Sequence, residues 1–164
     1  MKQFFKQFFL SLLVGLVAIQ FFKPEKNINK TPSEKYISAV INVPENVNGI
    51  LIKSCADCHS NNTQYPWYAN TQPIAWWLNH HIKEGKAELN IDSFANYSLR
   101  RQYRKLEEIM DEVEEDEMPL SSYTLIHRVA KLSETDREVL INWAKETRME
   151  MKQKYPLDSL IKKK

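Results

Sequence analysis

The residues of this chain with the most specific chemistry are Cys55-Ala56-Asp57-Cys58-His59. This C-x-x-C-H pattern is typical of covalent haem attachment. Thiols three residues apart project from the same side of a helical turn, where each can add to one of the two vinyl groups of a haem. The imidazole of His59 then lies below the iron, and we expect it to be the proximal ligand. The motif therefore predicts one covalent haem c per chain, held by thioethers from Cys55 and Cys58.

Two other kinds of site also use a C-x-x-C pair. A structural zinc site needs four ligands. Because the chain has only 2 cysteines, two of its 4 histidines would have to complete such a site, and none has the familiar paired spacing. A thioredoxin-like dithiol normally opens a helix that follows a strand, whereas the segments around Cys55 show helical periodicity. Haem attachment is favoured over both.

The second axial position of the iron decides between electron transfer and catalysis, because a carrier normally has two protein ligands and an enzyme leaves one position open. We favour Met118 as the distal ligand, since Pro119 must end the preceding helix and leaves the thioether on an extended segment. A methionine that only fills core space is the alternative. The other candidate ligands are His80, His81, His127 and Met110.

Aromatic and histidine side chains after the motif are candidates for the walls of the haem pocket. His80 and His81 are adjacent and diverge by about 100° on a helix, so at most one of them can face the haem. His81 shares its face with Trp77, and we place both at the pocket together with Trp67, where an indole N–H can bond a haem propionate. Ordinary core positions are the alternative, with His81 buried and hydrogen-bonded.

The N-terminal segment is much more apolar than the rest of the chain. Residues 8–22 carry no charge, and Lys2 and Lys6 precede them. Residues 1–23 therefore read as a membrane anchor or signal segment, and the lack of an A-x-A-like cleavage site favours retention as an anchor. Counted from Phe4, with Lys6 snorkelling, the segment has 19 residues. A spanning helix needs about 20.

The sidedness of this anchor rests on the cofactor rather than on charge. Lysines both precede and follow the apolar segment, so their distribution does not orient it. Bacterial haem c is attached outside the cytoplasmic membrane. We therefore expect a single-pass protein of the cytoplasmic membrane with its haem domain on the periplasmic side.

The remainder of the chain reads as a tether and one helical domain. Polar residues 24–44 predict a tether, residues 45–155 the domain and residues 156–164 a basic tail. Apolar spacings of three and four predict a helix from Glu45 into the motif, one over 74–85 that ends at Gly85, and one over about 99–117. Ser133 as N-cap and Asp136 three residues later predict the last helix. No strand is convincing, so the fold class is all-α.

The charge of the chain argues against nucleic acid as a partner. Three of the 23 Lys and Arg residues precede Pro24, whereas all 21 Asp and Glu residues follow it, so the chain from Pro24 onward is close to neutral. A nucleic-acid-binding domain would carry a basic patch. The acidic run Asp111–Glu117 is a solvated helix face or, alternatively, a docking site for a positively charged redox partner.

Several motifs together resemble the haem-binding domain family of short bacterial cytochrome c-like proteins, over nearly all of the chain after the tether. They are Cys55–Ser60, Asn62–Tyr68, His81–Gly85 with Leu89-Asn90, Glu117–Leu120, Tyr123, His127, Ala130–Ser133 and Trp143. The resemblance implies a cytochrome c-like helical fold, covalent haem on Cys55 and Cys58 with His59 as proximal ligand, and an N-terminal membrane segment. It does not imply a reaction. Lys86 and Asp92-Ser93-Phe94 depart from the family pattern, in which an arginine follows the glycine.

Three functions fit these features. We predict a monohaem electron carrier with His59 and Met118 on the iron, a protein as its redox partner and no enzymatic activity. A haem enzyme of peroxidase type is the alternative and needs an open distal position with an acid or base such as His81 or His127. Dihaem peroxidases pair two attachment motifs, however, and this chain has one. A redox or gas sensor would have to act through a partner.

Overall fold

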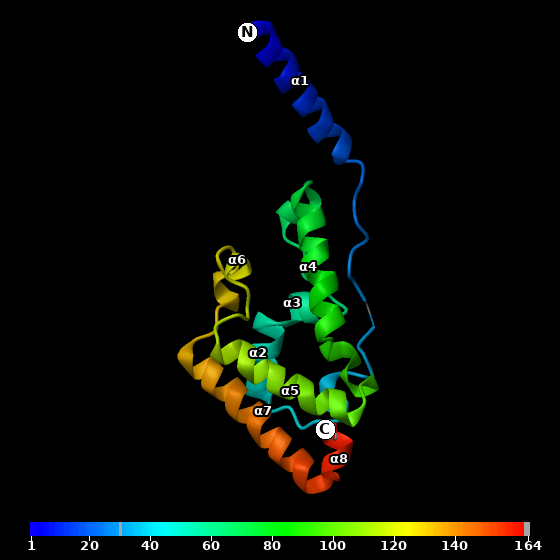
Figure 1. The fold of residues 1–164 in the computed structure, drawn as a ribbon, viewed down its shortest axis with the longest axis vertical. Coiled ribbons are helices and arrows are strands. Elements are labelled where there is room, and N and C mark those ends of the chain that lie inside the picture. Colours follow the sequence, from blue (N-terminus) through cyan, green and yellow to red (C-terminus); the bar gives the residue numbers. More distant parts are fainter. Residues whose placement is uncertain (30, 163–164) are drawn as a thin grey trace.

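The computed structural model describes residues 1–29 and 31–162, and these residues form an all-α structure without strands (Figure 1). Within them, an isolated β-bridge pairs Ile28 with Asn62. The longer helices are α1 (Lys2–Ile19), α2 (Glu45–Ser54), α4 (Ile74–Glu88), α5 (Leu99–Glu114) and α7 (Glu134–Lys154). Shorter helical turns are η1 (Ile37–Ala39), α3 (Ala56–His59), η2 (Trp67–Asn70), η3 (Ile91–Asn96), α6 (Ser121–Thr124), η4 (Arg128–Ala130) and α8 (Leu157–Leu160). The predicted all-α class is confirmed.

Helix α1 extends away from the rest of the molecule (Figure 1). It has 18 residues with a mean hydropathy of 1.4, and none of them is buried. At 1.5 Å per residue it is about 27 Å long, close to the thickness of a bilayer core. Length and composition thus allow α1 to cross a membrane.

The core of the domain lies between α5, α7 and α2. Leu106 of α5 packs with Leu140 and Ala144 of α7, and all three are fully buried. Leu51 of α2 joins the same cluster, four residues before Cys55. Because these apolar residues recur at spacings of three and four, each helix buries one face and leaves the other in water. The packing of α2 fixes where the attachment motif begins.

Parts of the segment over residues 24–44 pack against the domain, whereas a tether was expected from its polar composition. Ile37 in η1 and Ile41 after it are 0% and 7% exposed and belong to the core. The Asn27 side chain donates to the carbonyl oxygen of Ser60 and to Thr63 Oγ1, both at 2.9 Å. Two apolar residues among many polar ones form no periodic pattern, so only their contacts with distant helices reveal their burial. Leu160 in the expected tail is also buried, and Lys163 and Lys164 lie outside the described residues.

Helix α4 does not end at Gly85 as predicted but continues to Glu88. The reason for a glycine at this position is close packing rather than helix termination. A Cβ atom on residue 85 would lie 2.9 Å from the Cys58 carbonyl oxygen. Gly85 therefore lets α4 approach the backbone of the attachment motif in α3.

This approach makes Gly85→Ala destabilising despite the better helix propensity of alanine. Propensity alone would stabilise the helix by about 0.5–1 kcal/mol, whereas overpacking against a backbone atom costs about 1–3 kcal/mol. Gly49→Ala in α2 is the matched control, since a Cβ there meets nothing within 4 Å. Urea unfolding should show lower stability for Gly85→Ala and equal or higher stability for Gly49→Ala. Equal effects of the two substitutions would contradict the packing argument.

Helix α5 ends at Glu114, three residues earlier than the acidic run suggested. Asp116 adopts a positive φ of 63°, a left-handed conformation that stops the helix and that aspartate tolerates better than most residues. The backbone N–H groups of Glu117 and Met118 donate to the Glu112 carbonyl oxygen at 3.0 and 3.1 Å. The chain thus turns back sharply and brings Met118 beneath the end of α5.

Helix α7 begins as its sequence predicts. Ser133 Oγ accepts a hydrogen bond from the Asp136 backbone N–H, and the Asp136 carboxylate accepts one from the Ser133 backbone N–H, both at 3.1 Å. This reciprocal pair is a capping box. Lys53 Nζ donates to the same carboxylate at 2.9 Å and so joins α2 to α7.

The charge of Asp136 should therefore contribute to stability in a pH-dependent way. The Lys53 ammonium, and then the Ser133 backbone N–H, lower the pKa of Asp136. A folded-state pKa below the unfolded value of about 3.9 means that the contribution is complete above that pH and is lost as the pH falls through the folded pKa. We expect Asp136→Asn to cost about 0.5 kcal/mol at neutral pH, because the ion pair with Lys53 is partly exposed to water, with a smaller difference in acid. Urea unfolding at neutral and acidic pH measures both, and an equal loss at each pH would contradict this assignment.

Candidate functional site

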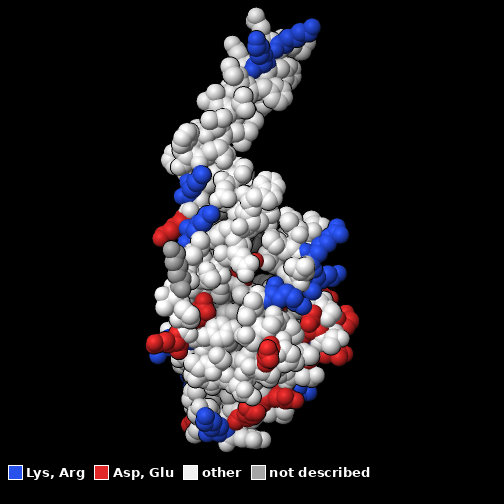
Figure 2. All heavy atoms as spheres, turned by 180° about the vertical axis from the view of Figure 1, so that it is seen from behind, with Lys and Arg blue, Asp and Glu red and all other residues white. Residues whose placement is uncertain are grey.

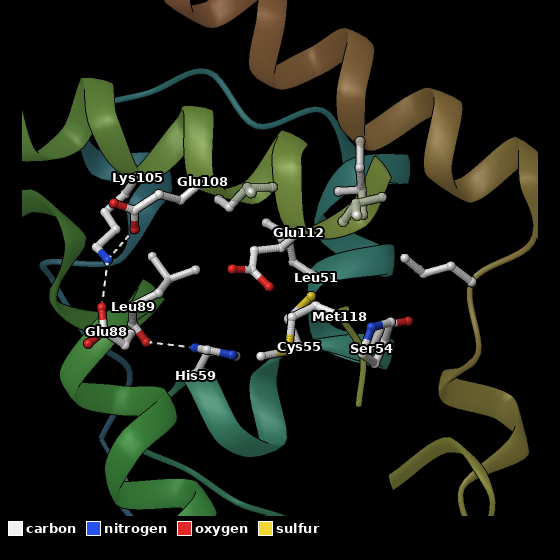
Figure 3. A pocket seen from close by; sticks show the side chains of 15 residues that line it. Leu51, Ser54, Cys55, His59, Glu88, Leu89, Lys105, Glu108, Glu112 and Met118 are labelled. Atoms are coloured by element: carbon white, nitrogen blue, oxygen red, sulfur yellow. Dashed lines mark hydrogen bonds and ion pairs between the residues drawn. The ribbon is translucent and has the colours of Figure 1, made fainter. Parts of the chain in front are cut away.

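A cavity of about 350 Å³ opens between the attachment motif, α5 and the segment that follows α5 (Figure 3). Its volume falls within the range of about 300–1,000 Å³ that is common for small-molecule sites. Cys55, His59 and Met118 all line it. Its apolar walls are formed by Leu51, Leu89, Ile109, Val113, Pro119, Leu132 and Leu140. The cavity brings together two of the predicted ligands and one of the predicted attachment thiols.

His59, the last residue of α3, points its ring into this cavity (Figure 3). Its Nδ1–H donates to the Leu89 carbonyl oxygen at 3.0 Å. A carbonyl oxygen can only accept, so this bond requires the proton on Nδ1 and leaves the Nε2 lone pair free in the neutral ring. Burial lowers the pKa of His59, although hydrogen bonds to the Leu89 and Gly85 backbone oppose the shift. A neutral imidazole with an oriented Nε2 is the form that binds a metal.

The two cysteine thiols are free and face different spaces. Cys55 lines the cavity with His59, whereas Cys58 lines a neighbouring cavity of about 270 Å³. Burial raises the pKa of Cys55 to about 12 and that of Cys58 to about 11. The cysteines of a thiol redox site have lowered pKa values. These environments therefore disfavour a thioredoxin-like dithiol.

Met118 lines the same cavity as His59 and is held there by the turn after α5. Its backbone N–H donates to the Glu112 carbonyl oxygen at 3.1 Å. A thioether and an imidazole on the walls of one apolar cavity form a ligand set that suits haem iron. Met110, one of the alternatives, packs against the core and is not among the residues of this cavity.

The other histidine candidates lie elsewhere. His81 and His127 line the neighbouring cavity with Cys58 and Trp77. His81 Nδ1 donates to the Trp77 carbonyl oxygen at 3.0 Å, and the His127 ring stacks on Tyr123 with 4.4 Å between the ring centroids. His80 is exposed and pairs with Glu84 at 3.1 Å. The structure thus groups none of these imidazoles with His59.

The two tryptophans that were predicted at the haem pocket, Trp67 and Trp77, do not lie together. Trp77 lies beside Cys58 in the neighbouring cavity. Trp67 is 83% exposed and lines neither of the two cavities. The position of Trp67 therefore differs from the expectation of a haem-pocket wall. Its place in η2 turns the indole outward while Ala69 of the same turn is buried.

Four charged residues that line the cavity were missed from the sequence: Glu88, Lys105, Glu108 and Glu112. The Lys105 side chain is only 3% exposed, and its ammonium donates to Glu88 at 3.1 Å and also to Glu108 (Figure 3). The spacing along α5 could have predicted part of this lining, because Lys105, Ile109 and Glu112 fall on one face of the helix. These residues make one side of an otherwise apolar cavity polar.

A structural role for Asp57, which lies between the two cysteines, was also not predicted from the sequence. Its carboxylate accepts hydrogen bonds from Tyr123 Oη at 2.6 Å and from the Gln64 backbone N–H at 3.0 Å. Asp57 thereby joins the motif to α6 and to the loop that follows the motif. These hydrogen bonds explain why a residue with a carboxylate lies between Cys55 and Cys58.

The two departures from the family pattern do not line the main cavity. Lys86 Nζ donates to Asn27 Oδ1, which holds the segment before η1 against α4. The Asp92 carboxylate accepts from the Asn61 backbone N–H at 2.7 Å, and Phe94 is fully buried in the core. These residues support the loop around the motif.

Comparison with known proteins agrees with the chemistry of this cavity. The described residues are all-helical, and an imidazole and a thioether that could bind haem iron line one cavity. A family model described as a haem-binding domain matches residues 14–146. The chain therefore belongs to the haem-binding domain family, and haem is its cofactor. No curated protein and no solved structure matches the chain.

Proposed function

We propose that this protein is a monohaem c-type electron carrier. Cys55 and Cys58 would form thioethers to the haem, and His59 and Met118 would be its axial ligands. The observation that carries the proposal is that an oriented imidazole and a thioether line one apolar cavity beside the first attachment cysteine. Family membership supports the cofactor, and the C-x-x-C-H motif supports its covalent attachment.

In this proposal the haem supplies a one-electron couple, and the protein controls its environment. The hydrogen bond from His59 to Leu89 leaves the Nε2 lone pair free, so His59 would bind the iron through this nitrogen. Met118 would be the second protein ligand, and methionine ligation would raise the reduction potential and leave no position for substrate. Leu51, Leu89 and Leu140 line the cavity and would exclude water from the haem.

The peroxidase alternative receives less support from the arrangement. A peroxidase needs an open distal position and an acid or base close to it. The two histidines suggested for that role, His81 and His127, line the cavity beside Cys58 rather than the one that contains His59. An electron carrier needs neither group.

The proposed location is the outer face of the cytoplasmic membrane. Support comes from α1, which is long and apolar enough to span a bilayer. It also comes from the chemistry of attachment, because bacterial haem c is attached outside the cytoplasm. The redox partner would then be a protein of that compartment. Exposed carboxylates at the end of α5, among them Glu114 and Glu115, suit a positively charged surface.

The electronic spectrum of the ferric holoprotein tests the proposed function. A low-spin spectrum with a methionine-sulfur charge-transfer band is expected, because two strong axial ligands occupy the iron. Haem staining after denaturing electrophoresis would show whether the porphyrin is covalently bound. A high-spin ferric spectrum at neutral pH would overturn the carrier proposal in favour of an open distal site.

A further inference from the structure

Large apolar side chains are exposed on η2, on the start of α4 and on the segment from α6 to η4, and Ile74, Trp77 and Ile126 among them line one cavity. Trp67, Leu125 and Val129 are 83%, 75% and 80% exposed. We define the apolar face by these three residues together with Ile74, Trp76, Trp77 and Ile126, which are also exposed. Figure 1 shows the start of α4 and the short helix α6 at the end of the domain toward α1, with α8 and most of α7 at the opposite end. Clustered exposure of this kind usually marks an interaction surface.

The end of α1 is bonded directly to this region. The Gln20 side chain accepts from the Gln72 backbone N–H at 3.0 Å and donates to the Gln72 carbonyl oxygen at 3.2 Å. Trp76 Nε1 and Gln72 Nε2 both donate to the Phe22 carbonyl oxygen, at 2.8 and 2.7 Å. Gln72 itself is only 3% exposed. The apolar face therefore begins where α1 ends, and direct hydrogen bonds join the two.

Charge is distributed to match a membrane surface. None of the 21 Asp and Glu residues falls within residues 58–83 or 118–133, the two segments that form the apolar face. Arg128 and Lys131 are exposed beside Leu125 and Val129. Figure 2 shows most of the red side chains over the half of the domain away from α1, whereas the half toward α1 is mostly white and blue, with red atoms beside the lower end of α1. Tryptophan side chains with flanking basic residues are typical of segments that lie at a lipid headgroup region.

We propose that the apolar face rests on the bilayer surface, so that the haem domain contacts the membrane at a second site besides α1. The proposal depends on α1 being the membrane anchor of the proposed function. Its consequence is a fixed orientation of the domain on the membrane.

Photolabelling from within the lipid tests this contact on the complete holoprotein. The protein is reconstituted in vesicles of phosphatidylcholine and phosphatidylglycerol in equal parts, with a trace of phosphatidylcholine that carries a diazirine on the first carbons of its acyl chain. After irradiation, mass spectrometry locates the lipid adducts. We expect adducts in α1, around residues 67–77 and around residues 125–129. Leu157 and Ile161, exposed at the opposite end of the domain, serve as the internal control and should remain unlabelled.

A charge variant makes the test specific. Leu125→Glu combined with Val129→Glu should reduce adducts over 125–129 several-fold, because a carboxylate is costly at the acyl boundary. Both side chains are exposed, so the fold should be retained, and Met149→Glu on α7 is the matched control. Labelling of α1 with no more labelling of the apolar face than of Leu157 would overturn the contact while leaving the anchor intact. Absence of labelling from α1 as well would overturn the anchor and this contact together. Cross-linking of two copies through residues 125–129 without lipid adducts would assign the face to dimerisation and overturn the proposal.

Discussion

Replacement of both Cys55 and Cys58 by alanine should yield a polypeptide without covalently bound porphyrin. No thiol other than these two exists in the chain, so no sulfur would be available to add to the haem vinyl groups. The expected result is complete loss of haem staining on a denaturing gel and an intact mass equal to that of the polypeptide alone. Expression must take place in a host that can assemble c-type cytochromes. A variant that still carries the mass of one porphyrin would rule out attachment through these sulfurs.

Single substitutions refine this result. Cys55→Ala and Cys58→Ala each leave one thiol, so each variant should retain some haem through one thioether, at a lower yield. The yields also show which thiol contributes more to haem attachment: Cys55, in the cavity with His59, or Cys58, beside Trp77. Ile52→Ala is the matched control, because Ile52 of α2 is 54% exposed and lines neither of these two cavities. That variant should carry haem at the level of the unsubstituted protein.

Met118→Ala should change the iron centre without releasing the haem. Loss of the thioether removes the proposed distal ligand, so the sulfur charge-transfer band should disappear and the ferric iron should become high-spin or bind water. The reduction potential should fall, since methionine ligation raises it within the range of about 0.8 V that axial ligands span. Electronic spectra and potentiometric titration measure the two effects. Haem staining should remain, because attachment depends on the cysteines.

His81→Ala provides the control for this assignment. His81 lines the cavity beside Cys58 and bonds the Trp77 carbonyl oxygen, so its removal should leave the low-spin spectrum unchanged. The opposite pattern, with low-spin iron in Met118→Ala and high-spin iron in His81→Ala, would show that the distal ligand is the imidazole. The two variants thus distinguish the two ligand sets directly.

Local sequence signals predicted much of the fold. Capping by Ser133 and Asp136 placed the start of α7, and apolar spacing placed α2 and the start of α4. Such features are local, because a cap or an amphipathic face depends on residues within a few positions of one another. The ends of α4 and α5 were predicted wrongly because they do not follow from such local signals. Gly85 lies inside a helix because of contact with Cys58, and Asp116 ends α5 by a backbone conformation that its residue type permits without requiring.

The sequence by itself determined the all-α class, the apolar N-terminal helix and the motif whose chemistry indicates haem. Only the tertiary structure decided which side chains share a cavity. It grouped Met118 with His59, placed His81 and Trp77 in a neighbouring cavity, and turned Trp67 outward. It also buried Ile37 and Ile41 of the expected tether and the charged Lys105. The physical reason is that motifs and periodicity depend on neighbours along the chain, whereas a cavity and its polar corner depend on how segments distant in sequence pack against one another.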